Sequence, residues 1–552
     1  MSDPKTYDVA ILGSGIGGGV LACILARHGI DVLLLEREAH PRFAVGEAML
    51  PQSSMLMWML GQRYDVPEIL NLSRTQSITE HVAPSCGVKR TIGFLYHRDG
   101  RRQDPSEAHL LVPPVTPITS ESHLFRQDID LYLLNAALRY GVTYRDHVDA
   151  REVEVDRRGV KLTLDTGEEY RARYLVDGSG YKSVLASRFG LREEPSRLRT
   201  QSRTLFNHFE GIKRYDDLLE DWEDPKLSAR WNEGTVHHVF DGGWFWVIPF
   251  NNHEDGKNPL CSVGLTLDMR KYPRRPGVLP EDEFREIVRR FPSVAAHFAD
   301  ARTVRPWVST GRLQYSSTSC AGDRWFLAAH AYGFVDALYS RGLISTLDTL
   351  RTLTPRLMEA LRDDDFSRER FAFPERQQAA LLNSNDQMVH CSYQAFGSYP
   401  LWNSWIRLWL LSTMFNDFRH FRVIVKSLEA GDTGMFDLLD EMPLHGEGKP
   451  GDNPVQDLIN ATDGMLTAVE AGGMRAEEAS ERIFEMLRSA PLPPVHAWGD
   501  PGQHHLDFLP EKLVGLIKWG RTVAPPPFSS MFDFSPENYL KGEVQAEQAP
   551  AA

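Results

Sequence analysis

The chain has few cysteines, no long apolar run and no excess of positive charge. Its 552 residues include only five cysteines, which are widely spaced and form no Cys-x-x-Cys pair. This pattern excludes a disulfide framework and a structural zinc site, so we expect reduced and mostly buried thiols. No apolar stretch reaches the roughly 18 residues of a membrane-spanning helix, so no membrane association is expected.

The net charge of −14 and the N-terminal sequence exclude further classes of protein. Phosphate affinity depends on clustered Lys and Arg, and no basic stripe with interleaved aromatic residues occurs, so nucleic-acid binding is not expected. The opening residues, MSDPKTYDVAILGSG, lack the pattern of a signal peptide, which favours a cytoplasmic protein. The pairs His237-His238 and His504-His505 point apart on a strand or helix, and no His-Glu-x-x-His motif occurs, so no metal site is expected.

The first forty residues predict the fold class, which is α/β. The sequence YDVAILG, from Tyr7 to Gly13, has the composition of a buried strand, and a helix is predicted from about Gly17 to His28. A second strand, IDVLLLE, ends at Glu36. A β-α-β unit of about 30 residues requires a parallel pair of strands.

The remaining sequence separates into strand-rich and helical blocks. Short strands are predicted at about 141–189 and 234–267, where apolar and polar residues alternate. Helices are predicted at about 281–300 and 343–361, and the chain is mostly helical after about 364. A surface loop is predicted at 445–454 and a disordered tail at 541–552.

The turn between the first strand and helix fits the dinucleotide fingerprint G-x-G-x-x-G. Gly13 suits the tight turn, Gly15 lets the backbone approach a pyrophosphate, and Gly18 lets the helix pack on the strand. The phosphates then lie at the helix N-terminus, whose free N–H groups favour anions. An acid at the end of the second strand, Glu36, is expected to accept the ribose hydroxyls. The predicted cofactor contacts here are Gly13, Gly15, Ile16, Gly18, Glu36 and Arg37.

The fingerprint alone does not separate NAD from FAD, but three further segments favour FAD. HLFRQD (123–128) places Arg126 at the start of a helix, and LVDGSG (175–180) ends a strand in a glycine turn with Asp177 and Gly180. GFVD ends at Asp336, shortly before a helix that begins near Ser340-Arg341-Gly342. The N-terminus of that helix is suited to face a flavin ring. Each segment alone is more typical of a structural turn.

Residues 243–249, GWFWVIP, contain the motif W-x-W-x-I-P. Trp244 and Trp246 stand two residues apart on a predicted strand, so both side chains point to the same face. With Pro249 they either belong to a wall between a flavin and an organic substrate or form an ordinary core strand. Lys89, in the segment CGVK (86–89), is likewise either a reactive lysine or a surface lysine.

Together with the fingerprint, these motifs resemble the flavin-dependent halogenases, above all the branch that halogenates phenols. The resemblance extends from Tyr7 to about Trp409. It is carried by HPRFAVGEAMLP (40–51), CGVK (86–89), HLFRQDID (123–130), GWFWVIPFNNH (243–253) and GFVDALYSRGLIST (333–346). It implies an FAD-binding, Rossmann-like monooxygenase fold of the GR2 type, with a β-rich substrate module and a helical C-terminal region. It also implies that Gly46, Glu47 and Ala48 line the flavin and that the backbone near Arg341 and Gly342 holds a halide.

The resemblance implies a reaction as well. Reduced FAD and oxygen give a hydroperoxide, chloride or bromide attacks it, and the resulting hypohalous acid reaches Lys89. Lys89 then delivers the halogen to an electron-rich phenol, either by hydrogen-bonding hypohalous acid or as a haloamine. A lysine in a dry tunnel has a depressed pKa, which makes its amine reactive. The expected setting is natural-product or antibiotic biosynthesis.

The same comparison sets expectations for partners and domains. No second dinucleotide fingerprint occurs, so reduced flavin is expected from a separate NAD(P)H flavin reductase. The predicted core spans 1–362 and contains an inserted substrate module at about 80–120 and 195–310. A helical region at 363–540, rich in aromatic residues, is expected to cap the substrate pocket. The oligomeric state, with a homodimer as one candidate, and covalent attachment of FAD are left open.

Two positions depart from the pattern of related FAD enzymes. Ala329-His330 stand where many of them carry Gly-Asp, which affects one flavin contact. Tyr339 stands where tryptophan halogenases use a glutamate, which argues against an indole substrate. The first alternative function is an FAD-dependent aromatic monooxygenase (a hydroxylase), which shares the fingerprint but does not need both W-x-W-x-I-P and Lys89. The second is a flavin-binding module without enzymatic activity.

Overall fold

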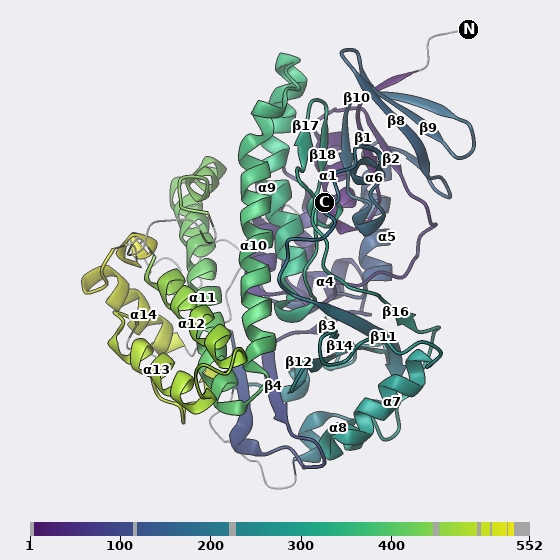
Figure 1. Cartoon of the computed structure of the whole chain (residues 1–552). Helices are drawn as coiled ribbons and strands as arrows, with labels where there is room; N and C mark the ends of the chain where they lie inside the picture. Colours follow the sequence, from purple (N-terminus) through teal and green to yellow (C-terminus); the bar gives the residue numbers. More distant parts are fainter. Residues whose placement is uncertain are drawn as a thin grey trace. The chain divides into compact units, whose positions relative to one another are not determined.

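A computed structural model describes residues 5–113, 119–219, 228–444, 446, 451, 453–493, 498–507, 510–526 and 528–534 (Figure 1). The chain forms two compact units, each assembled from separate stretches of sequence. Unit 1 consists of Met1–Ala83, Leu124–Thr200 and Gln314–Asp386, and unit 2 of Pro84–His123, Gln201–Leu313 and Gln387–Ala552. Most of the predicted loop at 445–454 and the entire predicted tail at 541–552 lie outside the described residues.

Unit 1 is built on a sheet that begins with the predicted β-α-β unit. β1 (Thr6–Leu12), α1 (Ile16–Arg27) and β2 (Val32–Leu35) follow in order, and β1 pairs in parallel with β2. The strand order is β17-β18-β10-β1-β2-β7, while β9 pairs antiparallel with β10 and β8 with β9. The further strands are β7 (Thr143–Arg145), β8 (Ala150–Asp156), β9 (Gly159–Leu164), β10 (Glu169–Asp177), β17 (Ala321–Gly322) and β18 (Trp325–Leu327). This arrangement confirms the predicted α/β fold class.

Close packing explains why the first strand and helix have their sequence. β1 and β2 are almost wholly apolar, because strands in the middle of a parallel sheet are buried on both faces. Val9 and Ile11 are fully buried. A Cβ atom at Gly18 would lie 1.9 Å from the carbonyl oxygen of Gly13, so α1 can approach the end of β1 only with glycine at this position.

Several helices of unit 1 lie where the sequence predicts them. They include α2 (Pro51–Arg63), α3 (Pro67–Leu70), α4 (Thr75–His81), α5 (Arg126–Arg139), α6 (Val184–Arg188) and α9 (Arg341–Asp363). α5 begins at Arg126, as expected, and α9 is the helix predicted at 343–361. α10 (Ala372–Ala395) begins in unit 1 and ends in unit 2.

Unit 2 contains a larger, mostly antiparallel sheet with the order β15-β11-β14-β13-β12-β4-β5-β19. Its strands are β4 (Thr91–His97), β5 (Ala108–Val112), β11 (Ser202–Glu210), β12 (Gly234–Phe240), β13 (Gly243–Pro249), β14 (Cys261–Asp268), β15 (Arg302–Thr303), β16 (Val308–Ser309, paired with β11) and β19 (His505–Asp507). A separate pair is formed by β3 (Gly87–Val88) and β6 (Ser122–His123). The helices are α7 (Pro280–Arg290), α8 (Pro292–His297), α11 (Tyr399–Ala430), α12 (Pro454–Glu470), α13 (Ala476–Ser489) and α14 (Pro510–Thr522).

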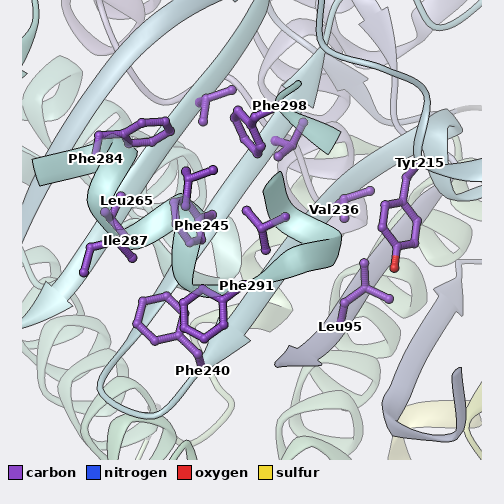
Figure 2. Packing of buried hydrophobic residues seen from close by; sticks show 14 of the residues in the cluster. Leu95, Tyr215, Val236, Phe240, Phe245, Leu265, Phe284, Ile287, Phe291 and Phe298 are labelled. Carbon is purple, nitrogen blue, oxygen red and sulfur yellow. The ribbon is translucent and has the colours of Figure 1, made fainter. Parts of the chain in front are cut away.

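The core of this sheet is a cluster of buried hydrophobic residues formed with α7 and α8 (Figure 2). Phe284, Ile287 and Val288 recur at helical spacing, so one apolar stripe of α7 faces the strands. Phe291 packs against Phe240 of β12 with ring centroids 4.7 Å apart. The same helix has acids in its first turn and arginines in its last, which suits its dipole.

The structure groups most of the C-terminal region with the strand-rich insertions in unit 2. β19 pairs in parallel with β5, so a strand from the C-terminal region lies at the edge of the sheet. Phe94 of β4 makes edge contacts with Trp402 and Trp409 of α11. These pairings are long-range, and neither leaves a local sequence pattern.

A row of buried histidines runs through the core of unit 2. Nε2 of His97 lies 2.9 Å from Nδ1 of His238, and Nε2 of His238 lies 2.9 Å from Nδ1 of His297. Burial lowers the pKa of His97 to about 3 and that of His297 to about 4, and it holds the pKa of His238 well below its usual value. All three imidazoles are therefore neutral at pH 7.

We expect unit 2 to lose stability as the pH falls from about 6.5 towards 4. In this range the unfolded chain protonates these histidines but the folded chain does not, since burial has lowered their pKa values. The unfolded state then binds more protons, so the free energy of unfolding falls with pH. Urea unfolding at about pH 7.5 and about pH 5 measures the difference.

His97→Asn should reduce the number of protons taken up on unfolding by about one. His81→Asn is the matched control, because the side chain of His81 is 56% exposed and should leave this number unchanged. An unfolding free energy of the wild-type chain that does not change between the two pH values would contradict the account.

Candidate active site

The glycine turn after β1 has the form of an anion site. Gly13 has φ +91°, and its N–H donates to the carbonyl oxygen of Leu35 at 2.8 Å, which joins the turn to the end of β2. α1 begins directly afterwards, and no side chain among the described residues caps its N-terminus. Its first N–H groups therefore point at the space in front of Gly15, where a pyrophosphate fits.

Glu36 lies beside this turn, as predicted. Its Oε2 accepts hydrogen bonds from the N–H and the hydroxyl of Ser14, both at 2.9 Å, and from Arg42 at 3.2 Å. Burial alone would raise the pKa of Glu36, but the charge of Arg42 and these hydrogen bonds hold the pKa below its usual value. The carboxylate is thus ionised at neutral pH and fits a ribose hydroxyl as an acceptor.

Two guanidinium groups stand over the glycine turn. A Cβ atom at Gly15 would lie 3.4 Å from Nη2 of Arg42 and 3.7 Å from Nη2 of Arg126. Arg126 is oriented by Asp130, whose two oxygens accept from its Nε at 2.9 Å and its Nη2 at 3.0 Å. The sequence analysis predicted Arg126 but missed Arg42, whose place in HPRF after the second strand was a usable clue. Both charges suit a diphosphate.

The remaining predicted cofactor residues fall into two groups. Gly46 has φ +97° and would bring a Cβ atom within 3.2 Å of Nη1 of Arg126, so it adjoins Arg126, and Glu47 and Ala48 follow it in the chain. Arg37, in contrast, is 40% exposed and its Nη1 lies 3.7 Å from the carboxylate of Asp149. Its assignment to the cofactor therefore depends on sequence position alone.

Asp177 shapes its own turn. Its carboxylate is fully buried and accepts four hydrogen bonds from Ser179, Ser183 and Leu185, at 2.6 to 3.2 Å. The turn then passes Gly180, where φ is +75° and an added Cβ atom would meet nothing within 4 Å. Asp177 thus organises the glycine turn, and its predicted contact with the cofactor stays a prediction.

The segment before α9 is strained. Tyr339 has φ +70° and Ser340 has φ +52°, which L-residues rarely adopt, and α9 begins at the next residue, Arg341. Asp336 supports the turn by accepting the N–H of Leu338 at 3.0 Å. Such strain is frequent at ligand sites, and the N–H groups of Arg341 and Gly342 in the first helical turn suit an anion.

In unit 2, Lys89 follows β3 and is almost completely buried, with a relative exposure of 2%. Its backbone N–H donates to the carbonyl oxygen of Glu121 at 3.0 Å. Burial lowers the pKa of the Lys89 ammonium to about 7, although the negative charge of Glu121 opposes the shift. Lys89 is therefore not a surface lysine, and amine and ammonium coexist near neutral pH.

The two tryptophans of W-x-W-x-I-P are buried on β13 with ring centroids 5.6 Å apart. Nε1 of Trp244 donates to the hydroxyl of Tyr393 at 3.2 Å, and Nε1 of Trp246 donates to the hydroxyl of Ser262 at 3.2 Å. The pair is thus fixed by hydrogen bonds as well as by packing. Tyr393 belongs to the aromatic C-terminal stretch that the sequence analysis expected near the substrate.

Asn252 fixes the backbone next to Lys89. Its Oδ1 accepts the N–H of Val88 at 2.9 Å, and its Nδ2 donates to the carbonyl oxygen of Val88 at 2.8 Å. A Cβ atom at Gly87 would lie 2.5 Å from the carbonyl oxygen of Pro249, so glycine allows the two segments to meet. The sequence analysis did not single out Asn252, because one asparagine in a loop carries no pattern.

His123 connects the same elements. Its Nδ1 donates to the carbonyl oxygen of Pro249 at 2.8 Å, so its Nε2 accepts from the hydroxyl of Thr235 at 2.9 Å. Burial lowers the pKa of His123 to about 3, and the charge of Lys89 contributes. The W-x-W-x-I-P motif is thereby joined to the β6 strand that pairs with the strand before Lys89.

Comparison with known proteins identifies the class. A model of the FAD binding domain matches residues 6–213. Tetracycline 7-halogenase from Kitasatospora aureofaciens is 42% identical over 517 residues, which cover 93% of this chain and 93% of that protein. Monodechloroaminopyrrolnitrin halogenase PrnC from Pseudomonas fluorescens is 40% identical over 542 residues, 97% of this chain and 95% of PrnC.

A solved halogenase structure is similar to this chain over almost its whole length. Halogenase PltM in complex with phloroglucinol and FAD has a TM-score of 0.85 at 33% identity, and the match covers 91% of this chain and 99% of PltM. Fold and site thus define an FAD-dependent oxidoreductase of the monooxygenase type. More specifically, the chain belongs to the flavin-dependent halogenases. This membership replaces both the hydroxylase and the non-enzymatic alternative.

Three further findings concern the expected absences. All five cysteines are described and buried, and none forms a disulfide, as expected. Within the described residues, no group of three or more His, Cys, Asp or Glu side chains is arranged to hold a metal ion. None of the described helices combines the length and apolarity needed to cross a membrane.

Arg42→Ala should weaken FAD binding about 10- to 100-fold, since a charged hydrogen bond contributes about 1.5–3 kcal/mol. Arg27→Ala is the matched control and should change the dissociation constant by less than about twofold, because its side chain is 42% exposed and its charge is already paired with Asp65. Quenching of flavin fluorescence measures both constants. Equal losses in the two variants would contradict the placement of Arg42 over the turn.

Proposed function

We propose that this halogenase transfers chlorine or bromine to an electron-rich phenolic ring through Lys89. The observation that carries the proposal is the burial of Lys89, which lowers its pKa to about 7 in the unit that also holds W-x-W-x-I-P. A lysine on the surface would have no such property. The role of each residue follows from its unit.

Unit 1 is assigned the oxidation of halide. When bound and reduced, FAD supplies with oxygen the oxidising equivalents that convert halide to hypohalous acid. Glu36, Arg42 and Arg126 would hold the nucleotide part, and Gly46 to Ala48 would line the flavin. The first turn of α9 at Arg341 and Gly342 would hold the halide through backbone N–H groups.

Unit 2 is assigned the transfer of the halogen. The ammonium form of Lys89 would donate a hydrogen bond to hypohalous acid and polarise it. The neutral amine would instead react with hypohalous acid to give a haloamine and water, and the haloamine would pass the halogen to the ring and recover its proton from the ring carbon. Both forms are present near pH 7, so the structure suits either route. Trp244 and Trp246 would keep the ring away from the oxidant.

A phenol is favoured as the substrate for two reasons. PltM, whose structure contains phloroglucinol, matches almost the whole chain. Tyr339 occupies the position where a tryptophan halogenase would need its glutamate, and a phenol supplies its own electron density. The chain carries one dinucleotide fingerprint, so a separate NAD(P)H reductase would provide reduced flavin. Relatives named for tetracycline and pyrrolnitrin halogenation favour a place in antibiotic biosynthesis.

Lys89→Met should lose halogenated product by about 100-fold or more, since removal of one positioned donor or nucleophile has this order of effect. The same substitution should raise the free energy of unfolding, because a buried, desolvated amine is replaced by an apolar side chain. Mass spectrometry of the halogen isotope pattern, with FAD, a flavin reductase, NADH, bromide and phloroglucinol, measures the first effect. Urea unfolding measures the second.

Lys271→Met is the matched control, because the side chain of Lys271 is 45% exposed and should change neither quantity. The pH dependence separates the two routes in the wild-type chain. A rate that rises through about pH 7 indicates the amine, and a rate that falls indicates the ammonium. Halogenation by Lys89→Met at the wild-type rate would remove Lys89 from the mechanism.

A further inference from the structure

The short turn at Ala329–Ala331 lies after β18. Its first residue is alanine where many related FAD enzymes carry glycine, but the backbone keeps a conformation suited to glycine. Ala329 has φ +49°, in the left-handed region that glycine adopts without strain. Its N–H donates to Oε1 of Gln378 at 2.6 Å, which fixes the turn. The aspartate usual at the next position has been replaced by His330, so a negative charge is missing here.

The imidazole of His330 lies against the first turn of α9. A Cβ atom at Gly342 would lie 3.1 Å from both Cε1 and Nε2 of His330, so the imidazole reaches the helix backbone only because this residue is glycine. The ring also meets Phe334 edge-on, with centroids 5.2 Å apart. His330 thus adjoins Gly342, one of the two residues whose backbone is assigned to the halide.

The charge of His330 is suited to an anion at this place. Burial lowers the pKa of His330 to about 4, and the positive charge of Arg126 contributes. The imidazole is therefore neutral at pH 7 and carries one N–H donor. Among the described residues, neither ring nitrogen has a hydrogen-bond partner. A carboxylate in the same position would repel a halide.

We propose that His330 is a halide-positioning residue, whose ring N–H and lack of negative charge complete the anion site made by the backbone at Gly342. The inference deepens the proposed function, since it depends on the halide site at the start of α9. It involves no proton transfer. The N-termini of many helices favour anions. In this proposal the side chain of His330 distinguishes the start of α9 from those other helices.

The test compares His330→Asp with His330→Asn in the FAD-saturated, oxidised enzyme at about pH 7.5. Bromide binding is measured without turnover, from the change in the flavin absorption spectrum during a bromide titration, with sulfate as the control salt. His330→Asp should weaken bromide binding by about tenfold or more, because it adds a like charge. His330→Asn keeps a neutral donor and should remain within about threefold of the wild type.

The FAD affinity and the steady-state kinetics of both variants are measured as well. The affinity for FAD should stay within about threefold in both variants, and the KM for bromide should rise in His330→Asp more than kcat falls. Unchanged bromide affinity in His330→Asp, while the wild type makes halogenated product, would overturn this inference and leave the proposed function standing. A loss of FAD affinity with unchanged bromide affinity would also overturn it. A wild type that neither binds bromide nor yields product would refute the proposed function itself.

Discussion

The burial of one lysine is the constraint on which the active site depends. An ammonium group transferred from water into a packed interior loses hydration, and its pKa falls until the neutral amine becomes accessible. Lys89 reaches this state in unit 2, where burial outweighs the negative charge of Glu121. His123 and His237 have pKa values lowered to about 3 by burial, so both are neutral neighbours. The site therefore gives up stability to obtain a reactive nitrogen.

Such a lysine stays buried only if its backbone is held. Asn252 binds both the N–H and the carbonyl group of Val88, in the manner of an adjacent strand. Gly87 permits the close approach to Pro249, and His123 joins the same carbonyl to Thr235. Trp244 and Trp246 lie on β13, the strand that ends at Pro249. Lysine and motif are thus positioned by one set of contacts, which explains why the sequence carries both.

The part of the fold and site that could be predicted from the sequence depends on local patterns. Gly13 to Gly18, the apolar β1 and β2 and the acid Glu36 follow from short-range rules of strand, helix and turn, and the structure places them as expected. Lys89 and W-x-W-x-I-P were found through resemblance, and burial of the lysine was anticipated. Asn252 and β19 were missed because their partners are far away in sequence. Arg42 was missed although its partner Glu36 is only six residues away. The turn contacts of Asp177 were not foreseen, because sequence gives no direction for a side chain.

The protonation state of Lys89 can be measured directly. Lysines labelled with ¹³C at Cε show a chemical shift that follows protonation of the amine, and Lys89→Met identifies the signal of Lys89. The burial of this side chain predicts a midpoint of about 7. A midpoint near the ordinary lysine value of 10.5 would show that the ammonium remains hydrated, and it would contradict the central claim.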